Sequence, residues 1–189
     1  MRRAVLLLLI STSLACAEPP HKEMNQAQGA IDAAKSAGAE QFAATELTGA
    51  IDALGRAETF VVQRDYRQAL NSAIESRERA QSAAKAAVDA RARARGDAEA
   101  LLAEANTLLT QARARLGDAE AARVSRRATQ DARQAIDAAQ TSVQNARTAL
   151  DKDDYAAAKK ALQGVSARIY RAISQIMDAR LPAAQRDRR

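Results

Sequence analysis

The chain has 189 residues and is 47% hydrophobic, but alanine supplies most of that fraction and aromatic residues make up only 3%. With 7 glycines, 3 prolines and no tryptophan, it lacks the turn formers and β-branched runs that α/β folds need. The formal net charge is +6, and acidic and basic residues alternate along the chain as they do on solvated helix faces. Composition therefore predicts an all-α protein made of long, closely packed helices.

The N-terminus, MRRAVLLLLISTSLACAEPP, is typical of a bacterial export signal. Two arginines precede an apolar run that is too short to span a bilayer as a mature helix. The tetrapeptide SLAC, at residues 13–16, resembles the lipobox of bacterial lipoproteins. This resemblance predicts a signal peptide over residues 1–16, with lipid attached to Cys16. Ordinary secretory cleavage after Ala17, at an A-x-A-like site, is the alternative.

Cys16 is the only cysteine, so the chain has no internal disulfide, and the residue is better explained as an anchor than as a redox thiol. The acyl chains typical of such lipoproteins would hold the chain firmly in a membrane. By the same resemblance, Ala17 after the cysteine favours the outer membrane, with the protein facing the periplasm. Residues 17–21 would form a short, stiff tether.

A first helical unit is predicted over residues 22–95. Its first helix should span residues 22–36, with Gly38 as the left-handed residue that ends it. The second should start at Thr45 as the N-cap and end near Gln63, and Asp65 should cap a long helix over residues 66–116. Spacings of three and four mark the buried positions: Met24, Ala27, Ile31 and Ala34; then Leu47, Ile51, Leu54, Ala57 and Val61; then Tyr66, Leu70, Ala73, Ala80, Ala84 and Ala87.

A second unit is predicted over residues 96–181, followed by a basic tail at residues 182–189. We expect the long helix to continue through Gly96, with Leu101, Ala105, Leu108 and Ala112 on its buried face, and to stop at Gly117, where Asp118 would cap the next helix. A coiled-coil-like seam should follow at Ala128, Ala132, Ala135, Ala139, Val143, Ala146 and Leu150. The last helix should run from Tyr155 to Pro182, burying Tyr155, Ala158, Leu162, Val165, Ile169, Ile173 and Ile176.

Two segments of the chain look alike. AIDA at residues 50–53 leads to Asp65-Tyr66, and the same four letters at residues 135–138 lead to Asp154-Tyr155. In each we expect the aspartate to cap a helix and the tyrosine to pack under the turn with its hydroxyl in solvent. The expected fold is thus an elongated antiparallel helical bundle, coiled-coil-like, of two three-helix units that share one long central helix.

The first unit resembles DUF4398, an alanine-rich domain of unknown function in bacterial envelope lipoproteins. The resemblance covers roughly residues 24–90. The matching residues are Ala27, Ile31, Ala34, Ala37-Gly38-Ala39, Phe42, Glu46-Leu47, Ala50, Leu54, Ala57, Asp65-Tyr66, Ala69-Leu70 and Ala73. The chain departs from the family pattern at Phe42, where Tyr is usual, and at Ala44, where Pro is usual. The resemblance implies an all-helical envelope domain and carries over no catalytic residue.

The sequence offers no material for common catalytic or metal sites. His21 is the only histidine and lies in the tether, so neither a Ser-His-acid triad nor a histidine-based metal site can be assembled. No glycine-rich phosphate loop is present, and most carboxylates neighbour arginines. The tripeptide Arg95-Gly96-Asp97 falls inside a helical pattern and is interpreted as a chance match. We therefore expect no catalytic residues, no metal and no cofactor.

Two arginine clusters are the candidate binding residues. The first contains Arg91, Arg93 and Arg95, and the second contains Arg123, Arg126 and Arg127. A solvated helical face is one interpretation of each, and contact with an anionic partner is the other. Nucleic acid is not expected, because the clusters lack interleaved aromatic residues.

The sequence therefore predicts a non-catalytic, membrane-anchored envelope lipoprotein that acts as a helical scaffold or adaptor for another envelope protein. The alternative is a periplasmic module that binds anionic glycan or lipid headgroups through the arginines. Salt dependence separates the two, because ionic capture weakens with added salt. The seam at residues 128–150 could pair within the chain, which we favour, or with a second copy in a homo-oligomer.

Overall fold

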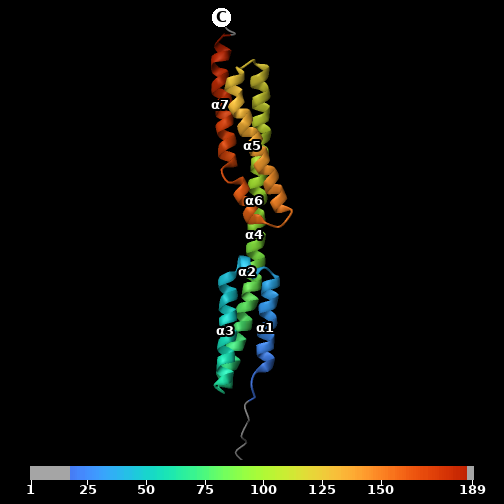
Figure 1. The fold of residues 1–189 in the computed structure, drawn as a ribbon, viewed down its shortest axis with the longest axis vertical. Coiled ribbons are helices and arrows are strands. Elements are labelled where there is room, and N and C mark those ends of the chain that lie inside the picture. Colours follow the sequence, from blue (N-terminus) through green and yellow to red (C-terminus); the bar gives the residue numbers. More distant parts are fainter. Residues whose placement is uncertain (1–17, 187–189) are drawn as a thin grey trace, which may run out of the picture. The chain divides into compact units, whose positions relative to one another are not determined.

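The structure, a computed structural model, describes residues 18–186, and the described residues form only α-helices and their connections. The chain divides after Val88 into two compact units. Unit 1 contains α1 (His21–Ser36), α2 (Ala39–Phe42), α3 (Ala44–Val62) and the first part of α4 (Tyr66–Ala121) (Figure 1). Unit 2 contains the rest of α4, α5 (Arg126–Leu150), α6 (Tyr155–Leu162) and α7 (Val165–Arg186). The predicted all-α fold is confirmed.

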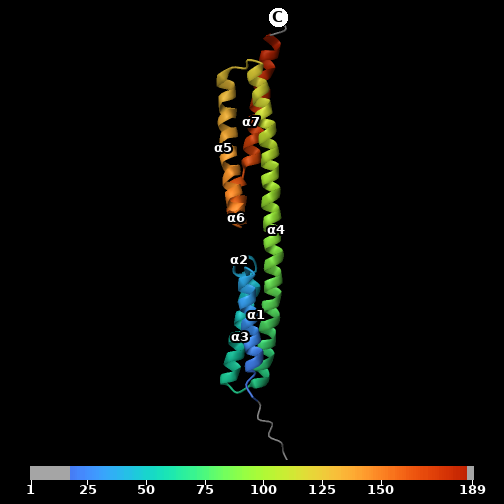
Figure 2. The same ribbon diagram turned by 90° about the vertical axis from the view of Figure 1, so that its right-hand side faces the viewer.

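Unit 1 is held together mainly by alanine. Helices α1 and α3 lie beside the first part of α4 in both ribbon views (Figures 1 and 2). Their shared core contains Ala27, Ile31, Ala34, Ala39, Ala43, Leu47, Ala50, Leu54, Ala80, Ala83 and Ala87. Because a buried methyl group removes little apolar area from water, this core depends on close approach of the helices rather than on large side chains.

The boundaries of α1 follow the prediction, and those of α3 differ at one end. Gly38 has a φ of 88°, the left-handed conformation that ends α1 without a Cβ penalty. The expected N-cap at Thr45 is wrong, because the short helix α2 intervenes and α3 begins at Ala44. The backbone carbonyl of Ala43 already accepts a hydrogen bond from the N–H of Leu47 at 3.1 Å.

The buried face of α3 also differs from the prediction. Ile51 is 43% exposed, whereas Ala50 and Ala53 are fully buried. The reason is steric: the alanines let α3 approach α4 closely, and a branched side chain at this place would hold the helices apart. The prediction from the sequence chose Ile51 because it is more hydrophobic than the neighbouring alanine.

Helix α4 runs without a break from Tyr66 to Ala121, so the expected continuity through Gly96 is confirmed. The predicted stop at Gly117 is wrong. The helix ends instead at Ala121, and Arg123, whose φ of 56° is left-handed, turns the chain away while the N–H of Val124 donates to the carbonyl of Ala119 at 3.0 Å. Val124 is buried in the core of unit 2, and this hydrophobic contact fixes the end of the helix beyond the glycine.

Unit 2 has larger core residues than unit 1. The seam on α5 packs within the chain against α6, α7 and the second part of α4 (Figure 2). The large buried residues of the unit 2 core include Leu108, Leu109, Leu116, Ile136, Val143, Leu162, Val165, Ile169 and Ile176. Leu101, predicted to be buried, is 36% exposed because the neighbouring Leu102 turns toward the core instead.

The predicted last helix is two helices. Gly164 adopts a φ of 71°, and this left-handed residue separates α6 from α7. Leu162 and Val165 are both buried on either side of it, so the apolar spacing continues across the break and hides it from the sequence pattern. Pro182 does not end α7, which extends to Arg186. Because proline has no N–H, Pro182 leaves the carbonyl of Asp178 without its helical hydrogen bond, a loss that falls near the end of α7.

The two look-alike hairpins share one turn geometry. A left-handed residue, Arg64 in unit 1 and Asp153 in unit 2, precedes each capping aspartate. The carboxylate of Asp65 accepts from the N–H of Gln68 at 3.1 Å, and that of Asp154 accepts from the N–H of Ala157 at 2.9 Å. Both predicted caps are confirmed.

Candidate functional site

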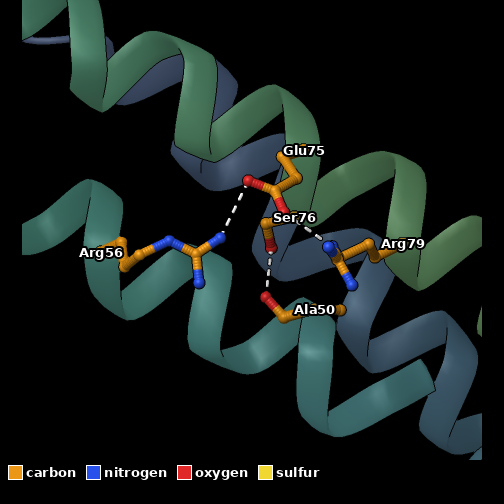
Figure 3. A network of polar contacts seen from close by, with 5 residues as sticks. All are labelled: Ala50, Arg56, Glu75, Ser76 and Arg79. Carbon is orange, nitrogen blue, oxygen red and sulfur yellow. Dashed lines mark hydrogen bonds and ion pairs between the residues drawn. The ribbon is translucent and has the colours of Figure 1, made fainter. Parts of the chain in front are cut away.

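The most connected polar group in unit 1 is Glu75 on α4 (Figure 3). One carboxylate oxygen of Glu75 accepts a hydrogen bond from Arg56 of α3 at 2.8 Å. The other oxygen accepts from Arg79, one turn further along α4, also at 2.8 Å. The hydrogen bonds from Arg56 and Arg79 lower the pKa of Glu75 below its usual value. Glu75 thus links α3 and α4 by ion pairs in a unit whose core side chains are mostly alanine.

A buried hydroxyl lies directly beside this network. Ser76 is fully buried and donates a hydrogen bond to the backbone carbonyl of Ala50 at 2.8 Å (Figure 3). Such a bond requires the backbone of α3 to lie within reach of a short side chain on α4. On the same side, a Cβ at Gly49 would lie 3.0 Å from a guanidinium nitrogen of Arg79, so the glycine leaves space for that arginine.

We predict that Glu75→Gln destabilises unit 1 at neutral pH and has no such effect in acid. The pKa of Glu75 is lower in the folded chain, so its stabilising effect is present above about pH 4.5 and is lost as the pH falls below that value. Because both ion pairs are partly exposed, we expect a loss of about 0.5–1 kcal/mol at pH 7. Urea unfolding at pH 7 and at about pH 3 measures it.

The matched control for this prediction is Glu78→Gln. Glu78 is an exposed glutamate on the same helix and forms no ion pair among the described residues. An equal loss in both variants, or a difference that persists in acid, would show that the Glu75 network does not stabilise the fold.

The first arginine cluster is largely neutralised by carboxylates of its own unit. Arg91 forms an ion pair with Asp153 at 2.8 Å, and Arg95 forms one with Glu99 at 2.8 Å. Arg93 is exposed and forms no ion pair in the described part of the chain. Two of the three predicted contacts for an anionic partner are therefore already engaged within unit 2.

Tyr155 explains how Asp153 is positioned. The tyrosine is buried, and its hydroxyl donates to Asp153 at 2.6 Å rather than reaching solvent as expected. This hydrogen bond and the nearby Arg91 guanidinium lower the pKa of the Asp153 carboxyl. The α5–α6 turn is thus tied to α4 through Arg91, at a separation of 62 residues in the chain.

The second arginine cluster is different, because its side chains have no carboxylate partner among residues 18–186. Arg123, Arg126 and Arg127 are exposed, and among the described residues none of them forms an ion pair. Arg123 and Arg126 line an open hollow of about 860 Å³ at the α4–α5 connection, together with Arg133, Ser125 and Gln130. The structure thus brings two of the three predicted residues to one hollow and leaves their guanidinium groups available.

Cys16 and the signal segment lie outside the residues that the structure describes. Within residues 18–186 there is no group of three or more metal-ligating side chains. No helix in that range is long and apolar enough to cross a membrane.

These observations define a class: an all-α protein whose chain forms two compact helical units, with alanine-rich packing in the first. Residues 22–98 match the family model described as a domain of unknown function, DUF4398, which confirms the resemblance seen in the sequence. This part of the chain, α1 to α3 and the first part of α4, is therefore similar to that family of unknown function. The chain matches no curated protein and no solved structure.

Sequence reasoning missed the Glu75 network and the tie between Arg91 and Asp153. The Glu75–Arg79 pair had a local signal, because residues four apart face each other on a helix. The partners Arg56 and Asp153 had none, because each depends on how two distant helices align.

Proposed function

We propose that the chain is a non-catalytic envelope lipoprotein, anchored through Cys16, that acts as a helical scaffold or adaptor for other envelope proteins. One observation carries the proposal: the uninterrupted helix α4 supplies buried residues to the cores of both units. The two units are therefore covalently joined without a loop, as suits a protein whose role is to hold surfaces rather than to enclose a substrate.

Exposed apolar side chains support a protein partner. Val62 in unit 1 is 85% exposed, and Tyr170 and Met177 in unit 2 are about half exposed. Tyr170 and Met177 are seven residues apart on α7, so they lie on one face of that helix. A partner helix could cover this face by ordinary helix-in-groove packing. A second copy of the chain would use the same face.

Only one of the two predicted arginine clusters supports a role in binding anionic groups. The carboxylates of Asp153 and Glu99 neutralise Arg91 and Arg95, so on this geometry the role rests on the second arginine cluster. The proposed scaffold role does not depend on it.

The proposal predicts that the wild-type chain carries lipid mass and sediments with membranes, whereas Cys16→Ala is not acylated and partitions into the soluble fraction. Intact mass spectrometry and membrane fractionation of bacteria expressing each form measure this. The physical reason is that three acyl chains bury far more CH₂ groups than a single reversible anchor does, at about 0.8 kcal/mol each.

A photo-crosslinker in place of Tyr170 tests the adaptor role, with one in place of Gln175, which is exposed on a different face of α7, as the control. We expect one discrete envelope-protein adduct from the Tyr170 position of the anchored chain and none from the control.

A wild-type chain that lacks lipid and stays soluble would contradict the anchored scaffold.

A further inference from the structure

The charge of the chain is divided unequally between its two units. Residues 18–88 carry 8 Lys and Arg against 10 Asp and Glu, so this part is slightly acidic. Residues 89–189 carry 19 basic residues against 13 acidic ones, which gives this unit a charge of +6. The basic excess of the protein therefore belongs to unit 2.

Within unit 2 the excess gathers where α4 ends and α5 begins. Residues 111–134 contain six arginines, no lysine and three carboxylates. Arg123, Arg126 and Arg127, named here the arginine surface, follow one another across this connection. All three are exposed without an ion pair in the described part of the chain, unlike Arg91 and Arg95.

The hollow beside the arginine surface is lined mainly by hydrogen-bonding groups. Besides Arg123 and Arg126, its polar lining residues are Glu120, Ser125, Thr129, Gln130, Arg133, Gln134 and Asp137. Arg133 forms an ion pair with Glu120, so one of the two carboxylates is already neutralised. Asp137 is the other. The two remaining positive charges, on Arg123 and Arg126, outnumber the one negative charge of Asp137, so an anion is favoured near the two arginines.

The residues of the arginine surface depart from the local preferences that stabilise helix ends. Arg126 and Arg127 lie in the first turn of α5, where a cation is unfavourable and where no acidic residue compensates. Arg123 adopts a left-handed backbone conformation that glycine would adopt with less strain. Side chains that break local preferences without a compensating contact are expected where a protein binds something.

We propose that the arginine surface binds the phosphate groups of anionic phospholipids at a membrane surface. Guanidinium groups pair with phosphate oxygens through two parallel hydrogen bonds, which lysine cannot do. Residues 89–154 contain no aromatic side chain on which a nucleic-acid base could stack. The hollow is open to solvent, so it suits headgroups presented together on a surface rather than one enclosed ligand.

The test measures how the full chain with Cys16→Ala, which lacks any acyl anchor, partitions onto vesicles. Vesicles of phosphatidylcholine alone are compared with vesicles that also contain phosphatidylglycerol. We expect binding only to the anionic vesicles, and weaker binding as salt is added. Each arginine near an anionic surface strengthens partitioning about fivefold, so Arg123→Gln, Arg126→Gln and Arg127→Gln together should weaken it about a hundredfold.

The matched control removes the same charge from unit 1, through Arg64→Gln, Arg67→Gln and Lys85→Gln. These residues are exposed and form no side-chain ion pair among the described residues. Circular dichroism confirms that both triple variants are folded. Equal losses in the two variants would overturn the proposal, because only net charge would then matter. It is also overturned if soluble polyphosphate binds the arginine surface and the anionic vesicles do not.

Discussion

Replacing Ile169 by alanine should destabilise unit 2 by about 3 kcal/mol. Ile169 is fully buried between the helices of unit 2, and its removal leaves a cavity that the packed helices cannot close. For a unit of this size, such a loss lowers the melting temperature by about 10–20 °C. Thermal unfolding followed by circular dichroism measures the shift.

The neighbouring variant Tyr170→Ala is the control for this effect. It removes more atoms than Ile169→Ala, but Tyr170 is 57% exposed, so we expect a change within about 0.5 kcal/mol. If Tyr170→Ala costs as much as Ile169→Ala, then α7 does not bury the face that the structure assigns to it.

In unit 1 the largest effect should come from adding volume rather than removing it. Ala34 on α1 is fully buried in the alanine core, and Ala34→Leu forces three extra carbon atoms between closely packed helices. We expect a loss of about 2–3 kcal/mol, measured by urea unfolding.

Ala33→Leu provides the comparison for Ala34→Leu. Ala33 is the preceding residue and is exposed, and leucine forms helices nearly as well as alanine, so stability should be almost unchanged. A tolerated leucine at position 34 would mean that α1 packs more loosely than the structure shows.

Much of the fold could be predicted because its signals are local. Asp65 and Asp154 cap helices through bonds to their own next turn, and Gly38 ends α1 through its own backbone angle. Such features need no knowledge of distant residues. The same holds for the period of the buried positions on α5.

The predictions were wrong where packing between distant segments of the chain determines which residues are buried or where a helix ends. At Ile51 the spacing admitted two faces for α3, and only the close approach of α4 selects the face with Ala50. At Gly164 the helix ends, but the spacing of the apolar residues continues across the break, so the sequence pattern does not reveal it. The arginine clusters could be located in the sequence, but whether a carboxylate neutralises each one depends on pairs such as Arg91 and Asp153, far apart in the chain.

The alanine core of unit 1 has a consequence for how its stability varies with temperature. The heat capacity of unfolding grows with the apolar surface that unfolding exposes, and alanine methyl groups expose little of it. Ala27, Ala34, Ala50, Ala80, Ala83 and Ala87 occupy places that leucine or phenylalanine fill in most cores. The free energy of unfolding of this domain should therefore change more gradually between cold and warm conditions than that of a domain with a large-residue core.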